Sequence, residues 1–304
     1  MNNIFSFIII SYNRAQDTID AVKNVLSLEN VVGWQKEIIV LNNASTTDYS
    51  IFESYLNQLS VEEKSLVNYI NHDKNLGVAG GRNLCIQKAT GKYLLFMDDD
   101  AEITNHDVMQ KVLNLYDKYE SENLAIIGFL GKNPFTGKTE TPLKNPDLIK
   151  DKNELFYNLF FGYGHVFPKT LIEETGFYQD DFFYGMEEYD LSYATIKQGY
   201  SILFTKDILV LHKQNPDGRE PSKTTYARMF ENKMIVVYKH LPMLYVITHF
   251  IMWSAFLLTK SKFDITLYFN TIKSMRSRMK VAKREVMNKS GMDYLKKVHA
   301  RITY

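Results

Sequence analysis

The chain of 304 residues is 45% hydrophobic and 23% charged, which is the composition of a folded globular protein and excludes a largely disordered one. The formal net charge is +1, but from Lys260 onward twelve Lys or Arg stand against three Asp or Glu, so this segment carries about +9 and the remainder about −8. Such asymmetry predicts a basic C-terminal segment that meets an anionic partner.

The first predicted element is a strand over residues 4–11, an apolar run rich in Ile and Phe. A run of this kind is typical of a strand buried in a parallel sheet. It lacks the basic residues and the small-residue cleavage site of a signal peptide. Cys85 is the single cysteine, so no internal disulfide can form, which fits a reducing compartment. We therefore predict a cytoplasmic protein.

Strands and helices alternate through the rest of the first two thirds of the chain. This alternation predicts an α/β fold with a mixed, mainly parallel sheet and helices on both faces. Residues 132–153 are rich in Lys, Pro and Thr and are predicted to form a mobile loop. The predicted strands lie at residues 37–41, 67–70, 93–97 and 201–211. The predicted helices begin at Asp17, after a Gly-rich turn at residues 77–81, at Thr104 with a capping box to Asp107, and at an acidic cluster within residues 180–199.

Three acidic residues, Asp98, Asp99 and Asp100, come directly after the predicted strand at residues 93–97. In open α/β sheets, ligands bind outside the carboxyl ends of the strands. Carboxylates crowded there repel one another unless a cation joins them, and oxygen ligands suit Mg²⁺ or Mn²⁺. Such an ion would bridge the phosphates of a nucleotide diphosphate and stabilise the charge on that leaving group. The alternative is an acidic turn that caps the next helix.

A second acidic cluster, Glu187-Glu188-Tyr189-Asp190, follows the aromatic segment at residues 182–185. Acids are favourable at any helix N-terminus, so a purely structural role is the alternative. The functional interpretation is a general base that takes a proton from an acceptor hydroxyl. One carboxylate base is enough for an in-line displacement at a sugar carbon, which would invert the anomeric configuration.

A histidine and a Gly-rich segment indicate a functional site only if they lie near the acidic residues. His212 follows a predicted strand, and an imidazole that faced the three aspartates would favour Mn²⁺. At residues 75–83, glycines precede a helix, where the backbone can approach an anion and Arg82 could contact a phosphate. The glycine spacing is neither the dinucleotide fingerprint nor a Walker loop.

Taken in order, these segments resemble family 2 glycosyltransferases with the GT-A fold, a Rossmann-like fold of nucleotide-diphospho-sugar transferases. The resemblance spans roughly residues 5–239. It implies an inverting transfer from a nucleotide-diphosphate sugar, with UDP favoured, to a hydroxyl of a glycan or lipid-linked acceptor in surface polysaccharide synthesis. The segments that carry it are FIIISYNR, IIVLNNAS, NLGVAGGRNLCIQKATGKYLLFMDDD, FFYGMEEYDLSYATIKQGY and ILVLHK.

The resemblance also implies a domain division and residue roles. Residues 1–239 would form the catalytic domain and residues 240–304 a helical basic extension. Glu188 falls on the position of the base, while Asp98, Asp100 and His212 would hold Mn²⁺ or Mg²⁺. The residues implied to bind the donor are Ser11, Asn13, Arg14, Asn42, Asn43, Asn75, Gly80, Arg82, Asp98 and Asp99. The residues expected near the acceptor or the sugar are Tyr163, Gly164, Glu187 and Asp190.

The chain departs from the family pattern at three places. Asn42 stands where the nucleotide-binding loop usually begins with Asp, and Glu188 is one methylene longer than the usual Asp base, so the acceptor must lie slightly further out. A downstream Arg-Asn pair common in the family is Glu231-Asn232 here. These changes concern the nucleoside, the acceptor and the phosphate contacts.

Residues 241–259 contain no Asp, Glu, Lys or Arg, and a strongly basic segment follows them. The apolar run is borderline for a membrane span. A helix lying on an anionic membrane surface, followed by a basic helix, fits better. The alternatives are packing on the catalytic domain, contact with a second subunit in a homo-oligomer, and a true span. No nucleic-acid motif or aromatic platform accompanies the basic residues, so no nucleic acid partner is expected.

Two other functions are compatible with parts of the pattern. A sugar nucleotidyltransferase would need a basic Gly-rich loop after the first strand, where this chain has Ser11-Tyr12-Asn13-Arg14. A non-catalytic protein that binds a nucleotide sugar, or a scaffold protein, is the other. The complete set of acids argues against the latter, because clustered carboxylates are costly to keep together without a cation.

Overall fold

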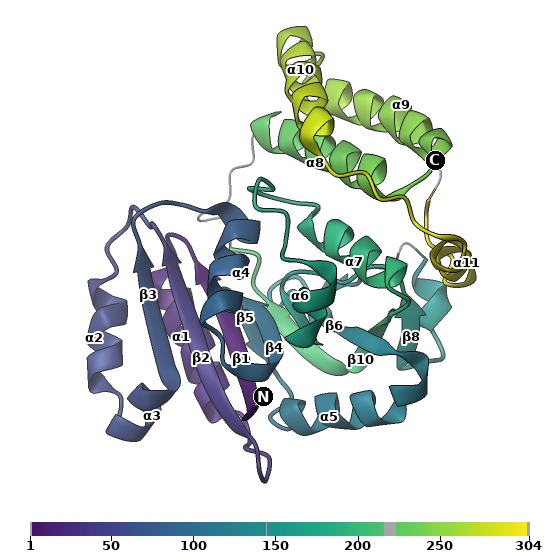
Figure 1. Ribbon diagram of the computed structural model, residues 1–304. Helices are drawn as coiled ribbons and strands as arrows, with labels where there is room; N and C mark the ends of the chain where they lie inside the picture. Colours follow the sequence, from purple (N-terminus) through teal and green to yellow (C-terminus); the bar gives the residue numbers. More distant parts are fainter. Residues whose placement is uncertain (1, 144, 216–222, 303–304) are drawn as a thin grey trace.

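The computed structural model describes residues 2–143, 145–215 and 223–302 of the chain (Figure 1). A single mixed sheet forms its centre, in the strand order β3-β2-β1-β4-β9-β6-β10-β5, with β7 paired to β6 and β8 to β10. The strands are β1 Asn2–Ser11, β2 Gln35–Asn43, β3 Val67–His72, β4 Gly91–Asp98, β5 Ala101–Ile103, β6 Leu124–Lys132, β7 Thr139–Glu140, β8 Glu154–Tyr157, β9 Gly164–Pro168 and β10 Ser201–His212.

The direction of the strands decides where functional side chains can meet. β1 pairs in parallel with β2 and β4, and β2 pairs in parallel with β3. β9 runs antiparallel between β4 and β6, and β6 pairs in parallel with β10. The carboxyl ends of β1, β2, β4, β6 and β10 therefore lie along the same edge of the sheet, where α/β proteins bind ligands.

Helices cover both faces of this sheet, and a separate apolar core lies under each layer (Figure 1). Val22, Phe52 and Val112 are fully buried on one face, whereas Ile86 and Phe230 are buried on the other. The predicted fold class is confirmed. The helices are α1 Ala15–Ser27, α2 Ser50–Gln58, α3 Val61–Leu66, α4 Gly77–Lys88, α5 Val108–Lys118, α6 Thr170–Thr175, α7 Glu187–Lys197, α8 Lys223–His240, α9 Met243–Lys260, α10 Ile265–Val281 and α11 Lys289–Lys297, with short 3-10 helices at Glu120–Glu122 and Pro146–Ile149.

Three predicted helix starts were wrong in detail. Asp17 lies inside the first turn of α1, whose N-cap is Arg14. The glycines at residues 77–81 begin α4 and do not form a turn before it. The predicted capping box at α5 is absent, because the Thr104 hydroxyl donates a hydrogen bond to the Leu209 carbonyl (3.1 Å) and the side chain of Asp107 caps no backbone group. At Thr104, a contact between β5 and β10 replaces local capping.

The segment at residues 132–153, predicted to be a mobile loop, contains ordered structure among its described residues. β7 pairs with β6, and Leu143 and Ile149 are buried against Tyr157 and Phe204. Full burial of a side chain of this size stabilises the fold by about 2 kcal/mol. Composition alone missed these two apolar anchors, because polar residues surround them in the sequence.

The C-terminal helices α8, α9 and α10 form a separate layer beyond α7 (Figure 1). α8 joins this layer to the rest of the molecule, because buried residues such as Phe230 and Val236 belong to the same core as Tyr193 of α7. α11 returns to the sheet, where the Tyr294 hydroxyl donates a hydrogen bond to the Tyr157 carbonyl (2.9 Å) and accepts one from the Ile202 backbone N–H (3.1 Å). The domain boundary at residue 239 stays a prediction.

Candidate active site

Strand pairing brings the three aspartates to His212. β4 ends at Asp98, a turn of two residues follows, and β5 begins at Ala101. Ala101 pairs directly with His212 at the end of β10, and the Lys213 backbone N–H donates a hydrogen bond to the Asp100 carbonyl (3.0 Å). The backbone ladder therefore fixes side chains that are more than a hundred residues apart in the sequence.

Asp98, Asp100 and His212 form a group that could hold a metal ion. One ligand atom of each residue lies within 4.8 Å of the other two. The His212 Nε2 is 3.6 Å from Asp98 Oδ2 and 3.4 Å from Asp100 Oδ1, and its Nδ1 is 3.2 Å from Glu140 Oε2. Two carboxylates and one imidazole suit Mn²⁺ well and also accommodate Mg²⁺. The carboxylate beside Nδ1 would orient the ring, as outer partners of metal-bound histidines commonly do.

The charges around His212 attract a cation. Burial lowers the pKa of His212, but the carboxylates of Asp100, Glu140 and Asp98 outweigh it and raise this pKa to about 10. Burial favours the neutral form of Asp98 and raises its pKa, while the nearby His212 opposes this effect. A His212 pKa of about 10 means that the ring holds a proton when no metal is bound, so a metal ion that used this nitrogen would have to displace that proton.

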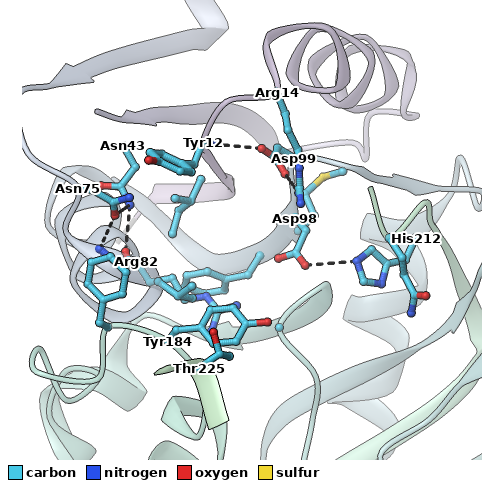
Figure 2. Close-up of a pocket in the computed structure, with 18 of the residues that line it drawn as sticks. Tyr12, Arg14, Asn43, Asn75, Arg82, Asp98, Asp99, Tyr184, His212 and Thr225 are labelled. Atoms are coloured by element: carbon cyan, nitrogen blue, oxygen red, sulfur yellow. Dashed lines mark hydrogen bonds and ion pairs between the residues drawn. The ribbon is translucent and has the colours of Figure 1, made fainter. Parts of the chain in front are cut away.

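Asp99 turns the other way and binds the loop after β1. Its Oδ1 is 2.7 Å from Arg14 Nη1, and its Oδ2 accepts a hydrogen bond from the Tyr12 backbone N–H at 3.2 Å (Figure 2). Arg14 Nη1 also lies 3.4 Å from Asp100 Oδ2. Burial raises the pKa of Asp99 to about 7, although Arg14 lowers it. Asp99 therefore links the metal-capable group to the wall formed by Tyr12 and Arg14.

A second wall comes from the loops after β2 and β3. The Asn43 Nδ2 donates hydrogen bonds to Asn75 Oδ1 (3.2 Å) and to the Gly77 carbonyl (3.1 Å), and its Oδ1 accepts one from the Leu76 backbone N–H (2.9 Å). Gly77 has φ +69°, and a Cβ there would lie 2.3 Å from the Phe183 carbonyl oxygen. Only glycine fits this close approach between the start of α4 and the loop before α7.

Arg82 of α4 holds the acidic pair at the start of α7. Its Nη1 lies 3.3 Å from Glu187 Oε1 and 3.3 Å from Glu188 Oε1. Burial raises the pKa of Glu187 to about 8, and the neighbouring Glu188 adds to this effect. The Glu187 side chain is 4% exposed and that of Glu188 is 18% exposed. Glu188 is therefore the acid of the pair that solvent or a ligand can reach.

Two adjoining cavities connect these groups. One of about 580 Å³ is lined by Asp98, Asp99, His212 and the Asn43–Asn75 wall. The other, of about 380 Å³, is lined by Glu187 and Glu188. The first volume is in the range of small-molecule sites. Residues that line both cavities are Val78, Arg82, Asp98, Glu140, Gly162, Tyr184 and Met229.

The structure brings most, but not all, of the predicted residues to these cavities. Among the described residues, those predicted for the donor that line the first cavity are Arg14, Asn43, Asn75, Arg82, Asp98 and Asp99 (Figure 2). Asp100 lies beneath it, 1% exposed, and Tyr163 lines the second cavity and stacks on the His212 ring at 5.1 Å.

The other predicted donor residues support the cavity from behind. The buried Ser11 hydroxyl is hydrogen-bonded to Thr18 and Tyr49. Asn13 adopts φ 60° and its Oδ1 accepts hydrogen bonds from the backbone N–H groups of Thr46 and Thr47. The Asn42 Oδ1 accepts one from the Ser45 N–H, and Gly80 lies within α4 against Leu76. Their contacts shape the loops, and they are not among the described residues that line either cavity.

Two of the residues predicted for the acceptor lie elsewhere. Asp190 points to α8, where its carboxylate is 2.8 Å from His240 Nε2 and 2.7 Å from Lys239 Nζ. This turn of α7 places Asp190 on the helix face opposite the cavity. Gly164 lies inside β9, where a Cβ would meet Val210 at 2.9 Å, so its role in the structure is close strand packing.

Sequence reasoning missed a third wall of the first cavity. Phe183 and Tyr184 come from the loop before α7, and Thr225, Arg228 and Met229 come from the first turns of α8. Arg228 lies over the Phe183 ring, 4.8 Å from its centroid. The aromatic segment was noticed in the sequence, but nothing in its pattern indicated that α8 would lie against it.

A mixed sheet with aspartates after β4 and a histidine at the end of β10, beside a cavity of this size, defines a GT-A type glycosyltransferase architecture. Residues 6–170 match the sequence model of Glycosyl transferase family 2, which covers more than half of the chain. The chain belongs to this family.

Relatives of known sequence share parts of the chain. A protein of Haemophilus influenzae, named only as uncharacterized, is 33% identical over 182 residues, which are 57% of this chain and 92% of that protein. The GalNAc(5)-diNAcBac-PP-undecaprenol beta-1,3-glucosyltransferase of Campylobacter jejuni is 28% identical over 187 residues, 60% of this chain and 56% of that enzyme. An uncharacterized glycosyltransferase of Rickettsia bellii is 38% identical over 95 residues, 31% of this chain and only 12% of its own length. The matches to these two named glycosyltransferases therefore span about half of the relative or less.

Solved structures agree with the fold. The mannosyltransferase PcManGT from Pyrobaculum calidifontis, in complex with GDP-Man and Mn²⁺, has a TM-score of 0.58 at 14% identity and covers 91% of this chain and 76% of its own. Residues 1–349 of TarS from S. aureus, in complex with UDP-GlcNAc, have a TM-score of 0.61 at 14% identity, covering 93% of this chain and 84% of theirs. At this level of identity, the likeness establishes the fold.

Proposed function

We propose that this protein transfers a sugar from a nucleotide-diphosphate sugar to a hydroxyl of a glycan or lipid-linked acceptor, with inversion at the anomeric carbon. The observation that carries the proposal is the pair of adjoining cavities, which have the Asp98–Asp100–His212 group in one and the acidic pair of α7 in the other. Sugar transfer requires a metal-capable group at the donor diphosphate and a base at the acceptor hydroxyl, separated by about the width of one sugar.

On the donor side, Asp98, Asp100 and His212 would hold Mn²⁺ or Mg²⁺. When bound, such an ion neutralises charge on the leaving diphosphate. Asn43 and Asn75 line the same cavity and offer amide groups to the nucleoside, while Arg14 and Arg82 add positive charge. UDP is the favoured nucleotide, which is consistent with the UDP-GlcNAc complex of the TarS fold relative.

On the acceptor side, Glu188 would act as the general base. Its carboxylate takes the proton of the acceptor hydroxyl as the oxygen forms a bond to the anomeric carbon. The bond from that carbon to the donor phosphate oxygen breaks, and the electron pair leaves with the nucleoside diphosphate. Attack from the face opposite the leaving group inverts the configuration. Glu188 is favoured over Glu187 because it is the more exposed of the two and because burial raises the pKa of Glu187 to about 8.

The names of two relatives support the proposed class of acceptor. The Campylobacter jejuni relative is named for a glycan linked to undecaprenol diphosphate, and an Escherichia coli relative, 32% identical over 103 residues (34% of each chain), is named as a putative colanic acid biosynthesis glycosyl transferase. We propose surface polysaccharide synthesis by a cytoplasmic protein at the inner face of the membrane. The domain division at residue 239 belongs to this proposal.

Thermal unfolding with UDP, GDP, dTDP or CDP, each with Mn²⁺ and with EDTA, tests the donor assignment. We expect one nucleotide to raise the Tm only when metal is present, since a ligand that binds the native state alone stabilises it. Asp100→Asn should abolish this shift, whereas Asp293→Asn, at an exposed acid of α11, should retain it. A metal-independent shift would contradict the metal site, and pyrophosphate release from a nucleoside triphosphate and a sugar phosphate would indicate a nucleotidyltransferase instead.

A further inference from the structure

Helix α9 is apolar and yet largely uncovered. It is the one helix in the described part of the chain that is long and apolar enough to be considered for a membrane span, with a mean hydropathy of 1.4 over Met243–Lys260, and only 17% of this stretch is buried. An apolar helix in the core of a soluble protein is mostly buried. The exposed apolar surface of α9 therefore indicates a binding partner outside the described residues.

The uncovered side has a defined composition. α9 packs on the rest of the molecule through Val246, His249, Ser254 and Leu257. The opposite side and the turn into α10 expose large apolar side chains, with Leu244 67%, Ile251 62% and Phe263 68% exposed. We call the exposed apolar side chains of α9, the following turn and the start of α10 the outer apolar face; its residues are Met243, Leu244, Ile247, Ile251, Met252, Phe263, Ile265 and Phe269.

The elements that carry the outer apolar face also carry exposed positive charge. The exposed basic residues near it come from the end of α9, the following turn and α10. Asp264, the acid in that turn, is paired with Lys223 at 3.2 Å. From Lys260 onward the chain carries twelve basic and three acidic residues. The exposed basic residues are Lys260, Lys262, Lys273, Arg276 and Lys280.

We propose that the outer apolar face docks on an anionic membrane surface, with α9 parallel to the membrane plane. Apolar side chains would enter the boundary between headgroups and acyl chains, and the flanking Lys and Arg would bind anionic lipid headgroups. This docking does not depend on the identity of the transferred sugar. It does deepen the proposed function, because it would present the cavities to a lipid-linked acceptor.

Two other occupants fit the structure less well. A transmembrane span would have to pull Val246 and Leu257 out of the core shared with α8. A second copy of the chain, paired symmetrically through this face, would bring the exposed Lys and Arg of α9 and α10 from both copies together, and like charges across an interface oppose association. An anionic lipid surface matches both the apolar side chains and the charge.

Flotation of the full chain with vesicles tests the proposal. We expect binding to vesicles of phosphatidylcholine with phosphatidylglycerol, weaker binding to phosphatidylcholine alone, and weakening at high salt. Ile247→Gln combined with Ile251→Gln should reduce binding about tenfold or more. Val32→Gln combined with Val61→Gln is the matched control, because these side chains are 99% and 91% exposed far from the face; it should bind as the unmodified protein does.

The outcomes separate docking from catalysis and from self-association. No flotation with anionic vesicles at low salt, or equal flotation of the Ile247/Ile251 variant, would overturn the proposal. If light scattering shows that the unmodified protein is a dimer and the Ile247/Ile251 variant is a monomer, the face is an interface between two copies instead. The metal-dependent nucleotide shift should be unchanged in this variant, so a failure of docking can be distinguished from a failure of the proposed chemistry.

Discussion

The two sides of the cavities are built in different ways. On one side, Asn43, Asp98 and His212 lie at the carboxyl ends of β2, β4 and β10, and the ladders of these strands with β1 and β5 hold them in place. On the other side, Tyr184 lies in a loop and Thr225 on the first turn of α8 (Figure 2). Strand ends are set by the sheet, whereas this loop depends on contacts from distant parts of the chain.

Arg278 shows how far those contacts reach. It comes from α10, and its Nε lies 2.8 Å from Asp181 Oδ2 in the loop before α7. Its Nη1 donates a hydrogen bond to Asn232 Oδ1 (2.8 Å), and the Asn232 Nδ2 donates one to the Gly185 carbonyl (2.9 Å). One guanidinium group thus ties the C-terminal layer to both ends of the loop that carries Tyr184. We therefore expect mutations at the strand ends to change donor and metal binding, and mutations at the loop and α8 to change acceptor binding.

The largest effect is expected on the strand-borne side. Asp100→Ala removes a carboxylate from the metal-capable group, and we expect sugar transfer to fall by about a thousandfold or more, because metal-assisted charge stabilisation contributes several kcal/mol. Transfer measured against Mn²⁺ concentration checks this, with Asp293→Ala on α11 as a surface control. Transfer that persists in EDTA would remove the metal from the mechanism.

The next largest effect is expected at the proposed base. Glu188→Gln keeps the size of the side chain but cannot accept a proton at a carboxylate, so turnover should fall by about a hundredfold to ten-thousandfold. The metal-dependent nucleotide shift should remain, since Glu188 lines the second cavity and not the first. Full turnover in this variant would exclude Glu188 as the base, and Glu187→Gln would then be the variant to examine.

A glycine between the two sides offers a sharper test of their contact. A Cβ at Gly162 would lie 2.2 Å from Arg82 Nη2 and 2.6 Å from Glu188 Oε1. Gly162→Ala should therefore push the Arg82–Glu188 pair aside and lower turnover about tenfold to a hundredfold, since small misplacements of reacting groups are costly. Steady-state kinetics with a soluble acceptor measures this. Unchanged kinetics would mean that the pair moves without consequence for the reaction.

The sequence allowed prediction of the strand-borne side because its information is local. Asp98 follows directly after an apolar run, and parallel strands end at one edge, so proximity to His212 could be expected. The position of Asp190 could not be predicted in this way, because its carboxylate is held by Lys239 and His240 of α8, far along the chain. The wall from Thr225 to Met229 and the role of Arg278 depend on helix packing between distant segments, which no local pattern contains.

A smaller effect is expected when the contacts of Arg278 are removed. Arg278→Ala removes the link between α10 and the loop at residues 181–185, and we expect KM for the acceptor to rise about tenfold with little change in the nucleotide shift. Arg276→Ala, exposed on the same helix, is the matched control in an assay without membranes. A loss of nucleotide binding in Arg278→Ala would show that the two sides are not independent.

The smallest effect concerns stability and pH. The pKa of Glu187 is raised to about 8 from an ordinary value of 4.5, chiefly by burial. The native state therefore binds a proton that the unfolded state releases between these values, so the contribution is fully present below pH 4.5 and is lost as the pH rises through about 8. Glu187→Gln keeps a neutral side chain at every pH. We expect the Tm of the unmodified protein to fall by a few degrees relative to this variant between about pH 5 and pH 9. Parallel Tm curves for the two proteins would mean that Glu187 is ionised in the native state and is held by Arg82.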